Sequence, residues 1–391
     1  MSERELMMIP GPVVYDPEVL RALSAPSLSH VSHEFVRVVG SVLRQLREVC
    51  FAPSAQPFVV AGSGTLAMEM AAANLIEPGD QVVVVNTGHF GDRMTMMLER
   101  QGAEVTQLRA PVGESPGREQ LESVLAGARF KAVSITHVDT STGVRSDAQG
   151  LVAVARSQGV LSIVDGVCAT AGERFEQEAW GADVYFTASQ KAIGVPPGLA
   201  LMTVSARGID AWRRRRSPVR AVYFDWAQWL PVMEGYEGGK PAYFGTPPVN
   251  HIAALDVSLR QILAEGMERR FARHERCARA FRAAWRAMGV EPVPKSEALA
   301  ANTLSALYLP ASIDGATFPA RVREEGVMVA GGLHAEIKAR SFRVGHMNAI
   351  NGSDVLATVG AIERALAKVG HKSELGAGVA AAQKILVERS G

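Results

Sequence analysis

Residues 161–191 read LSIVDGVCATAGERFEQEAWGADVYFTASQK, and they contain the pattern from which the fold can be inferred. Two apolar runs in this stretch, Leu161–Val164 and Val184–Thr187, have the length and composition of buried strands. Asp165 follows the first run directly, and Lys191 follows the second after a few residues. Buried strands of this kind usually end in loops that carry chemistry. An aspartate and a lysine at two such ends therefore indicate a functional site at one edge of a sheet.

Apolar runs alternate with amphipathic segments along most of the chain. Continuous apolar runs between helices predict an α/β fold with a mostly parallel, seven-stranded sheet covered on both faces. The stretch between the last two runs is too short for a crossover helix, so we expect the last strand to pair antiparallel. The expected strands are Phe58–Ala61, Gln81–Val85, Val105–Leu108, Ala132–Thr136, Leu161–Val164, Val184–Thr187 and Leu199–Val204, and the expected helices are about 30–50, Thr65–Ile76, Asp92–Gln101, Arg118–Leu125 and Asp147–Ser157.

Three parts of the chain are distinguished by composition. Residues 1–20, rich in proline, are interpreted as an irregular arm, residues 21–265 as the large domain, and residues 266–391 as a smaller α+β domain. The aromatic, Gly- and Pro-rich stretch 213–248 is interpreted as a long loop region. Further expected elements are a long helix from Asn250 to about Ala287, strands at Leu304–Leu309 and Ser341–Val344, and helices near Phe318–Glu325, Ser353–Val369 and Gly378–Arg389.

The charges of the chain nearly cancel, because 41 basic side chains face 40 acidic ones. This balance gives no electrostatic reason to expect nucleic acid or an anionic membrane as a partner. Cys50, Cys168 and Cys277 lie far apart without a CxxC spacing, so we expect neither a disulfide framework nor a zinc site, and a reducing compartment fits best. The first residues lack the pattern of a signal peptide, and a long apolar span is absent. We therefore expect a cytoplasmic protein.

The segment Ala61-Gly-Ser-Gly-Thr-Leu-Ala67 follows an expected strand and opens an expected helix. Its glycines allow a close backbone approach, and the hydroxyls of Ser63 and Thr65 lie beside the free N–H groups of the helix start, which suits a phosphate. A dinucleotide site would need an acid at the end of the next strand, but that strand ends in Asn86. We therefore prefer a single phosphate, with an ordinary strand-to-helix turn as the alternative.

Asp165 and Lys191 are best interpreted together with this expected phosphate site. Taken singly, the aspartate could cap a helix and the lysine could lie on the surface. Together they suit pyridoxal 5'-phosphate, since lysine forms a Schiff base with the aldehyde and a buried carboxylate keeps the ring nitrogen protonated.

The order of these motifs resembles the class V aminotransferases of fold type I, in particular the alanine–glyoxylate and serine–pyruvate aminotransferase group. The resemblance covers nearly the whole chain and implies the fold of the pyridoxal-phosphate-dependent transferases, and a homodimer. The segments that carry it are Pro10-Gly-Pro12, Ser63-Gly-Thr65, His137–Gly143, Val164-Asp-Gly166, Ser189-Gln-Lys191, Pro196-Pro-Gly198, Tyr243-Phe-Gly-Thr246 and Arg343.

The resemblance also assigns roles to single residues. Lys191 matches the Schiff-base lysine, and Asp165 matches the partner of the ring nitrogen. Arg343 matches the arginine that binds the substrate carboxylate, which a planar guanidinium does with two hydrogen bonds. Gly11 lies in the arm that lines the family's substrate pocket. The other matches are Ser63, Gly64, Thr65 and Gln190 to phosphate contacts, Thr140 to a hydroxyl near the cofactor's phenolic oxygen, Phe90 to an aromatic that stacks on the ring and is tryptophan in many members, and Tyr243 and Thr246 to phosphate contacts contributed by the other subunit.

This reading predicts that an amino group moves from alanine or serine to glyoxylate or pyruvate in two half-reactions that pass through the Lys191 aldimine. A 2-aminoethylphosphonate–pyruvate transaminase and a non-catalytic subunit with the same fold remain alternatives. A cysteine desulfurase is disfavoured because Cys277, the last cysteine, falls in a helical pattern, and a nicotinamide dehydrogenase because the ribose-binding acid is missing. The run Arg213–Arg216 is interpreted as a solvated face. The histidines at positions 30, 33, 137 and 251 lack the spacing of metal ligands.

Overall fold

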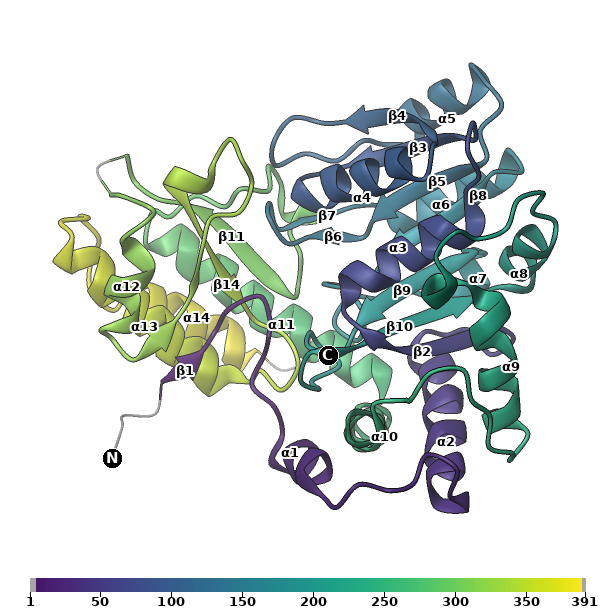
Figure 1. Ribbon diagram of the computed structural model, residues 1–391. Helices are drawn as coiled ribbons and strands as arrows, with labels where there is room; N and C mark the ends of the chain where they lie inside the picture. Colours follow the sequence, from purple (N-terminus) through teal and green to yellow (C-terminus); the bar gives the residue numbers. More distant parts are fainter. Residues whose placement is uncertain (1–4, 312, 389–391) are drawn as a thin grey trace.

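A seven-stranded sheet forms the larger part of the computed structural model, which describes residues 5–311 and 313–388 (Figure 1). Only β10 runs antiparallel to its neighbours, as its short connection predicts. The fold class and all seven strands expected from the sequence are confirmed. In spatial order the strands are β2 (Gln56–Gly62), β10 (Gly198–Val204), β9 (Val184–Ala188), β8 (Leu161–Asp165), β5 (Ala132–Thr136), β3 (Gln81–Asn86) and β4 (Glu104–Arg109).

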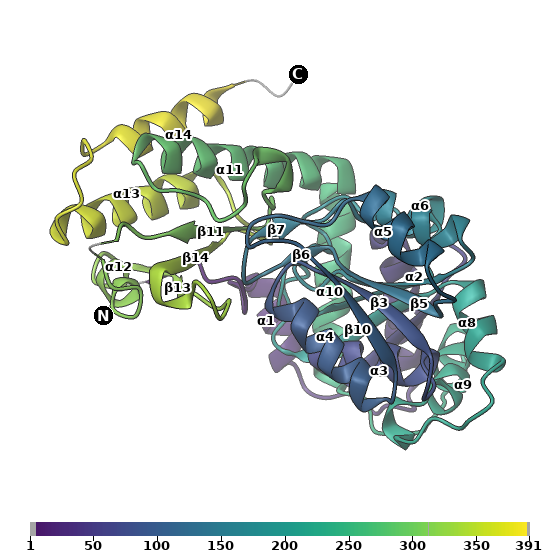
Figure 2. The same ribbon diagram turned by 90° about the horizontal axis from the view of Figure 1, so that it is seen from above.

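Helices cover both faces of this sheet because the direction of the crossovers reverses. The chain moves one way from β3 to β4, and the opposite way from β4 through β5 and β8 to β9. Right-handed crossovers then place the connecting helices on opposite faces, as Figure 2 shows. On one face lie α3 (Gly64–Leu75) and α4 (His89–Arg100), and on the other lie α5 (Arg118–Ala126) and α6 (Ala148–Ser157).

A second hydrophobic core lies around a small antiparallel sheet with the order β11-β14-β13. Its strands are β11 (Leu304–Tyr308), β14 (Ser341–Gly345) and β13 (Ala330–Gly331), covered by α11 (Met267–Ala287), α13 (Gly352–Lys368) and α14 (Ala377–Val387). The N-terminal arm joins this part through β1 (Leu6–Met7), which pairs parallel with β12 (Val327–Met328). The three domain ranges inferred from the sequence stay a prediction, and Arg389 of the last expected helix lies outside the described residues.

Two expectations about helices are wrong. The long helix expected from Asn250 is two helices, α10 (Val249–Glu265) and α11, because Gly266 between them has a φ of +82°. The stretch expected to be a loop contains α9 (Trp226–Glu237) and a short 3-10 turn at Val222–Phe224. The Asp225 carboxylate caps α9, and its buried residues at 226, 229, 230 and 233 have helical spacing, a signal that the glycines and Pro231 obscure.

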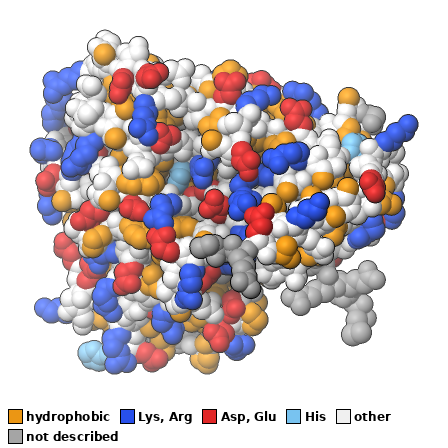
Figure 3. Space-filling model, turned by 180° about the vertical axis from the view of Figure 1, so that it is seen from behind, with side chains coloured by type: hydrophobic (Ala, Val, Ile, Leu, Met, Phe, Trp, Pro, Cys, Tyr) orange, Lys and Arg blue, Asp and Glu red, His pale blue; other side chains and the backbone are white. Residues whose placement is uncertain are grey.

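The expected irregular arm is also partly regular, since β1 lies in it and α1 (Pro17–Ser24) begins in it. The surface agrees with the nearly neutral charge balance. Acidic and basic side chains are interspersed over the face in Figure 3. Among the described residues, no helix has the length and apolar character needed to cross a bilayer.

Candidate active site

Asp165 is the last residue of β8 and lies at the carboxyl edge of the sheet. Its carboxyl group is buried, and its Oδ1 accepts a hydrogen bond of 2.8 Å from the Val167 amide. Burial raises the pKa of Asp165 to about 7, and the nearby Asp139 carboxylate pushes it in the same direction, while the Val167 hydrogen bond and Lys191 oppose the rise. Because few hydrogen bonds or positive charges offset the burial of this carboxylate, a cationic partner beside it is favoured.

Lys191 follows the neighbouring strand β9, and its Nζ donates to the carbonyl oxygen of Pro10 in the N-terminal arm. Gly11 makes this contact possible. A Cβ atom added to Gly11 would lie 2.6 Å from Cδ and 2.7 Å from Nζ of Lys191, and the φ of Gly11 is +100°. The arm therefore packs its backbone directly on the lysine side chain.

The close approach of the arm leads to a first prediction. Gly11→Ala is expected to displace the Lys191 amine and to lower kcat/KM about 10²-fold, the cost of a misplacement of about 1 Å. Gly370→Ala is the matched control, because Gly370 has a φ of +87° but open space around its Cα. Both variants should lose about 1–2 kcal/mol of stability through the left-handed backbone. Equal activity of the two purified variants in a transamination assay would contradict this role of Gly11.

The predicted phosphate site lies beside these two strand ends. Ser63 precedes α3 without capping it, so its hydroxyl is free of that role. Gly64 is buried, and a Cβ on it would lie 3.0 Å from Val167 and 3.3 Å from Ala188. The Thr65 hydroxyl accepts a hydrogen bond of 3.3 Å from Arg93. The free N–H groups of the α3 start and the Arg93 guanidinium together suit an anion.

Phe90 lies in the first turn of α4, where its position is fixed by Asp139. The Asp139 carboxylate accepts hydrogen bonds from the Phe90 amide at 3.0 Å and from the Ser141 amide at 2.9 Å. The Arg93 guanidinium lies 4.9 Å from the centre of the Phe90 ring. Phe90 is thus held between the loop after β5 and the arginine that contacts Thr65.

Thr140 lies in the larger part of the molecule, whereas Arg343 lies on the small sheet. The Thr140 hydroxyl lies 2.6 Å from the Cys168 sulfur in the interior. Arg343, on β14, is close enough to Asp139 for that carboxylate to raise the pKa of the guanidinium, although burial lowers that pKa more. Its Nε donates to the Gly331 carbonyl at 2.9 Å, and its terminal nitrogens have no hydrogen bond to the described part of the chain.

Gln190 is half-buried at the site, whereas Tyr243 and Thr246 are exposed. The Gln190 side-chain oxygen is buried without a hydrogen-bond partner among residues 5–311 and 313–388. Tyr243 is 62% exposed, and its hydroxyl lies 3.4 Å from that of Thr246. No hydrogen bond joins either residue to the strand ends of the described chain. The structure therefore brings together the other predicted site residues and leaves Tyr243 and Thr246 on the surface.

The residues at the strand ends fit pyridoxal phosphate. Asp165 offers a buried carboxylate to a protonated ring nitrogen, Lys191 offers an amine, and the α3 start offers donors to a phosphate. The buried side-chain oxygen of Gln190, which has no hydrogen-bond partner among the described residues, marks space for a ligand. The Gly64 backbone packs against Val167 and Ala188, and so holds the start of α3 close to the two strand ends.

Asp139 and Arg93 are site residues that the sequence did not single out. Their side chains act on Asp165, whose pKa Asp139 raises and Arg93 lowers. Asp139 follows a buried strand just as Asp165 does, which is a signal that could have been used. Arg93 offers only a spacing of three residues from Phe90, which is a weak signal.

Comparisons with known proteins agree with this arrangement. The family model described as Aminotransferase class-V matches residues 18–350. Alanine–glyoxylate aminotransferase 1 of Saccharomyces cerevisiae is 38% identical over 358 residues, which cover 88% of this chain and 92% of that protein. L-aspartate–glyoxylate aminotransferase of Paracoccus denitrificans is 32% identical, with 98% of this chain and 96% of that protein covered. The solved structure of pyridoxamine-pyruvate aminotransferase from Mesorhizobium loti has a TM-score of 0.92 at 28% identity, and covers 98% of this chain and 97% of that chain.

Proposed function

The chain belongs to the class V aminotransferase family, and we propose that it transfers an amino group from alanine or serine to glyoxylate or pyruvate with pyridoxal phosphate as cofactor. The observation that carries the cofactor proposal is the placement of Asp165 and Lys191 at the carboxyl ends of the adjacent strands β8 and β9. The acceptors are supported by the names of the relatives, two of which use glyoxylate and one pyruvate.

The roles of the chain's own residues follow from their chemistry. When bound, the cofactor supplies an aldehyde carbon for an amine and a ring that withdraws electrons from the substrate. Asp165 holds a proton on the ring nitrogen through its buried carboxylate. Lys191 would anchor the cofactor through its Nζ, and the same amine would remove the proton from the substrate's α-carbon. The α3 start with Ser63, Gly64 and Thr65, together with Gln190, would hold the phosphate, and Phe90 and Thr140 would contact the rest of the cofactor.

Arg343 is proposed to bind the substrate carboxylate. Its Nε is already bonded to the Gly331 carbonyl, so the two terminal nitrogens remain for a carboxylate in a two-point contact. Because burial lowers the pKa of this guanidinium, an anionic substrate is favoured beside it. With Gly11 and the arm on the other side, this grip turns the α-proton toward Lys191.

A matrix of amino donors and keto acceptors, assayed on the purified enzyme with pyridoxal phosphate, tests the substrate proposal. The highest kcat/KM is expected for alanine or serine with glyoxylate or pyruvate.

Arg343→Gln should lower kcat/KM for every pair of donor and acceptor about 10²-fold, since a charged two-point contact contributes about 2–3 kcal/mol. Arg340→Gln, at an exposed arginine nearby, is the control. Activity confined to a different donor would overturn the substrate assignment.

A homodimer with shared sites is also proposed, in which Tyr243 and Thr246 contact the cofactor phosphate of the other subunit. The Tyr243 ring is exposed and its hydroxyl pairs with that of Thr246, and both observations support this arrangement.

A cytoplasmic location is proposed as well, because the three cysteines are buried as free thiols.

Mixed dimers test the shared site. Lys191→Ala and a Tyr243→Ala/Thr246→Ala double variant should each have very low activity alone. After unfolding and refolding together in equal amounts, about a quarter of the wild-type activity is expected, since half of the dimers are hybrids with one complete site. Refolding each variant alone is the control. Activity no higher than the average of the two separate variants would contradict the sharing of residues between subunits.

A further inference from the structure

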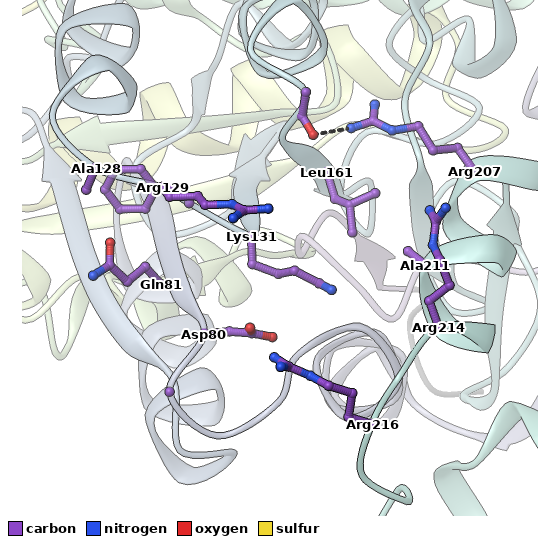
Figure 4. Close-up of a pocket in the computed structure, with 13 residues that line it drawn as sticks. Asp80, Gln81, Ala128, Arg129, Lys131, Leu161, Arg207, Ala211, Arg214 and Arg216 are labelled. Atoms are coloured by element: carbon purple, nitrogen blue, oxygen red, sulfur yellow. Dashed lines mark hydrogen bonds between the residues drawn. The ribbon is translucent and has the colours of Figure 1, made fainter.

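A cavity lies at the opposite edge of the main sheet from the candidate active site. It has a volume of about 830 Å³. Gln81 at the start of β3, Lys131 just before β5 and Leu161 at the start of β8 line it, together with residues of α8 (Ala206–Arg213) and the loop that follows. Figure 4 shows the side chains that surround this space.

Cations dominate the lining of this cavity. The five basic residues come from three separate segments of the chain, while Asp80 is the acid among the described lining residues. In Figure 4 the arginine and lysine side chains extend into the space between the loop after α5 and the loop after α8. The basic residues are Arg129, Lys131, Arg207, Arg214 and Arg216.

Most of these charges have no structural partner. Arg207 is occupied, because it lies 3.4 Å from the Asp183 carboxylate and donates at 2.9 Å to the Gly159 carbonyl, a bond drawn in Figure 4. Asp80 accepts a hydrogen bond of 2.8 Å from the Glu77 amide. The other four basic side chains make no ion pair with an acid anywhere in residues 5–311 and 313–388.

The run Arg213–Arg216, interpreted from the sequence as a solvated face, is divided by the structure into two kinds of residue. Arg213 projects from the end of α8 and lies 3.9 Å from Asp210. Arg215 donates to the carbonyls of Asn74 at 3.2 Å and Ile76 at 2.9 Å, and so fixes the loop on the end of α3. Arg214 and Arg216 line the cavity instead. An ion pair thus accounts for Arg213 and hydrogen bonds for Arg215, whereas the side chains of Arg214 and Arg216 have no such partner in the described part of the chain.

We propose that this cavity binds a small molecule with three or more negative charges, carried by phosphate or carboxylate groups. Four unpaired cations around one space repel one another, and a polyanion between them removes this repulsion. Guanidinium groups bind phosphate and carboxylate oxygens in two-point contacts, which suits the three arginines among the four.

The size and position of the cavity favour a free small molecule over a macromolecule or the substrate. Its volume lies within the range of about 300–1,000 Å³ that is typical of small-molecule sites. It is also separate from the proposed transamination site. Strand β8 runs from Leu161 in the cavity to Asp165 in that site, a span of roughly 13 Å at the rise of a β-strand. A ligand here leaves the substrate pocket open.

Calorimetric titration with inorganic tripolyphosphate and, separately, with citrate tests the proposal. The protein is saturated with pyridoxal phosphate beforehand, so that the phosphate site near Lys191 is filled. Saturable binding of one molecule per chain is expected for at least one of the two probes, and it should weaken as salt rises. The probe that binds more tightly identifies the acidic group. Absence of saturable binding with both probes would overturn the proposal.

Two neighbouring arginines provide the matched variants. Arg214→Gln should weaken binding about tenfold, the effect of one charged hydrogen bond, whereas Arg213→Gln should change it less than twofold. Both residues are exposed, so both variants should fold, and melting curves check this. Equal weakening by the two variants would mean adsorption to a basic surface and would refute a defined site. Tighter binding of a single-stranded oligonucleotide, lost in Arg214→Gln, would replace the small-molecule site by a nucleic-acid surface.

Discussion

Replacing Lys191 with alanine is expected to lower kcat about 10⁴-fold or more for every donor and acceptor pair. The proposal gives its Nζ two tasks, anchoring the cofactor and moving the α-proton, and general acid–base catalysis alone contributes about 10²–10⁴-fold. The substitution removes a side chain that contacts the Pro10 carbonyl, so a modest loss of stability is expected as well.

Two further variants separate chemistry from folding. Lys191→Arg keeps the positive charge but cannot perform either task, so it should be as inactive as Lys191→Ala. Lys384→Ala, at an exposed lysine on α14, should retain full activity. Steady-state assays and melting curves on the three variants are sufficient. If Lys191→Arg kept a tenth or more of the wild-type kcat, the assignment of both tasks to this amine would be wrong.

Asp165→Asn is expected to have opposite effects on activity and on stability. Loss of the carboxylate leaves the protonated ring nitrogen without its buried partner, and breaking such a pair costs about 3–5 kcal/mol. This corresponds to a fall in kcat/KM of roughly 150- to 4,000-fold. In the cofactor-free protein the same carboxylate has no cationic ring beside it, so its replacement by a neutral group should be stabilising.

The pH dependence of the stability of the cofactor-free protein reports directly the cost of burying the ionised Asp165 carboxylate. Burial raises the pKa of Asp165 to about 7, so the folded chain holds this proton more tightly than the unfolded chain does. The contribution of this proton to the free energy of unfolding is fully present below the pKa of about 4 that Asp165 has in the unfolded chain. It is lost as the pH rises to about 7. At pH 8 the cofactor-free Asp165→Asn protein should therefore be more stable than the wild type, by up to about 4 kcal/mol in the free energy of unfolding. Its melting temperature should be correspondingly higher.

Near pH 4 the stability difference between these two proteins should shrink toward zero. Asp210→Asn, at an exposed aspartate on α8, is the control and should follow the wild type at both pH values. A cofactor-free Asp165→Asn protein that is less stable than the wild type at pH 8 would contradict the burial argument.

Much of the fold was predictable because its strands are short apolar runs buried on both faces. The central strands β3, β5, β8 and β9 are buried over nearly their whole length, whereas the edge strand β4 is largely exposed. The antiparallel direction of β10 followed from the length of one connection. Helix α9 was missed because the proline and glycines around it hid four buried residues at helical spacing.

The site was predictable to the extent that its residues follow strands. Asp165 and Lys191 could be recognised because each comes after an apolar run. Asp139 accepts a hydrogen bond from the amide of Phe90, 49 residues away, and no local pattern indicates such a contact. The unpaired charges of Arg214 and Arg216 are likewise visible only once the strand starts at Gln81 and Leu161 are brought beside them.

Peptide mapping after borohydride reduction tests the central claim most directly. The purified protein is incubated with pyridoxal phosphate, reduced, digested and examined by mass spectrometry, with Lys384→Ala and Lys191→Arg as parallel samples. The account predicts one cofactor adduct per chain, on the peptide that contains Lys191, and its loss in Lys191→Arg alone. An adduct on a different lysine in the wild type, or a wild-type chain without any adduct, would contradict it.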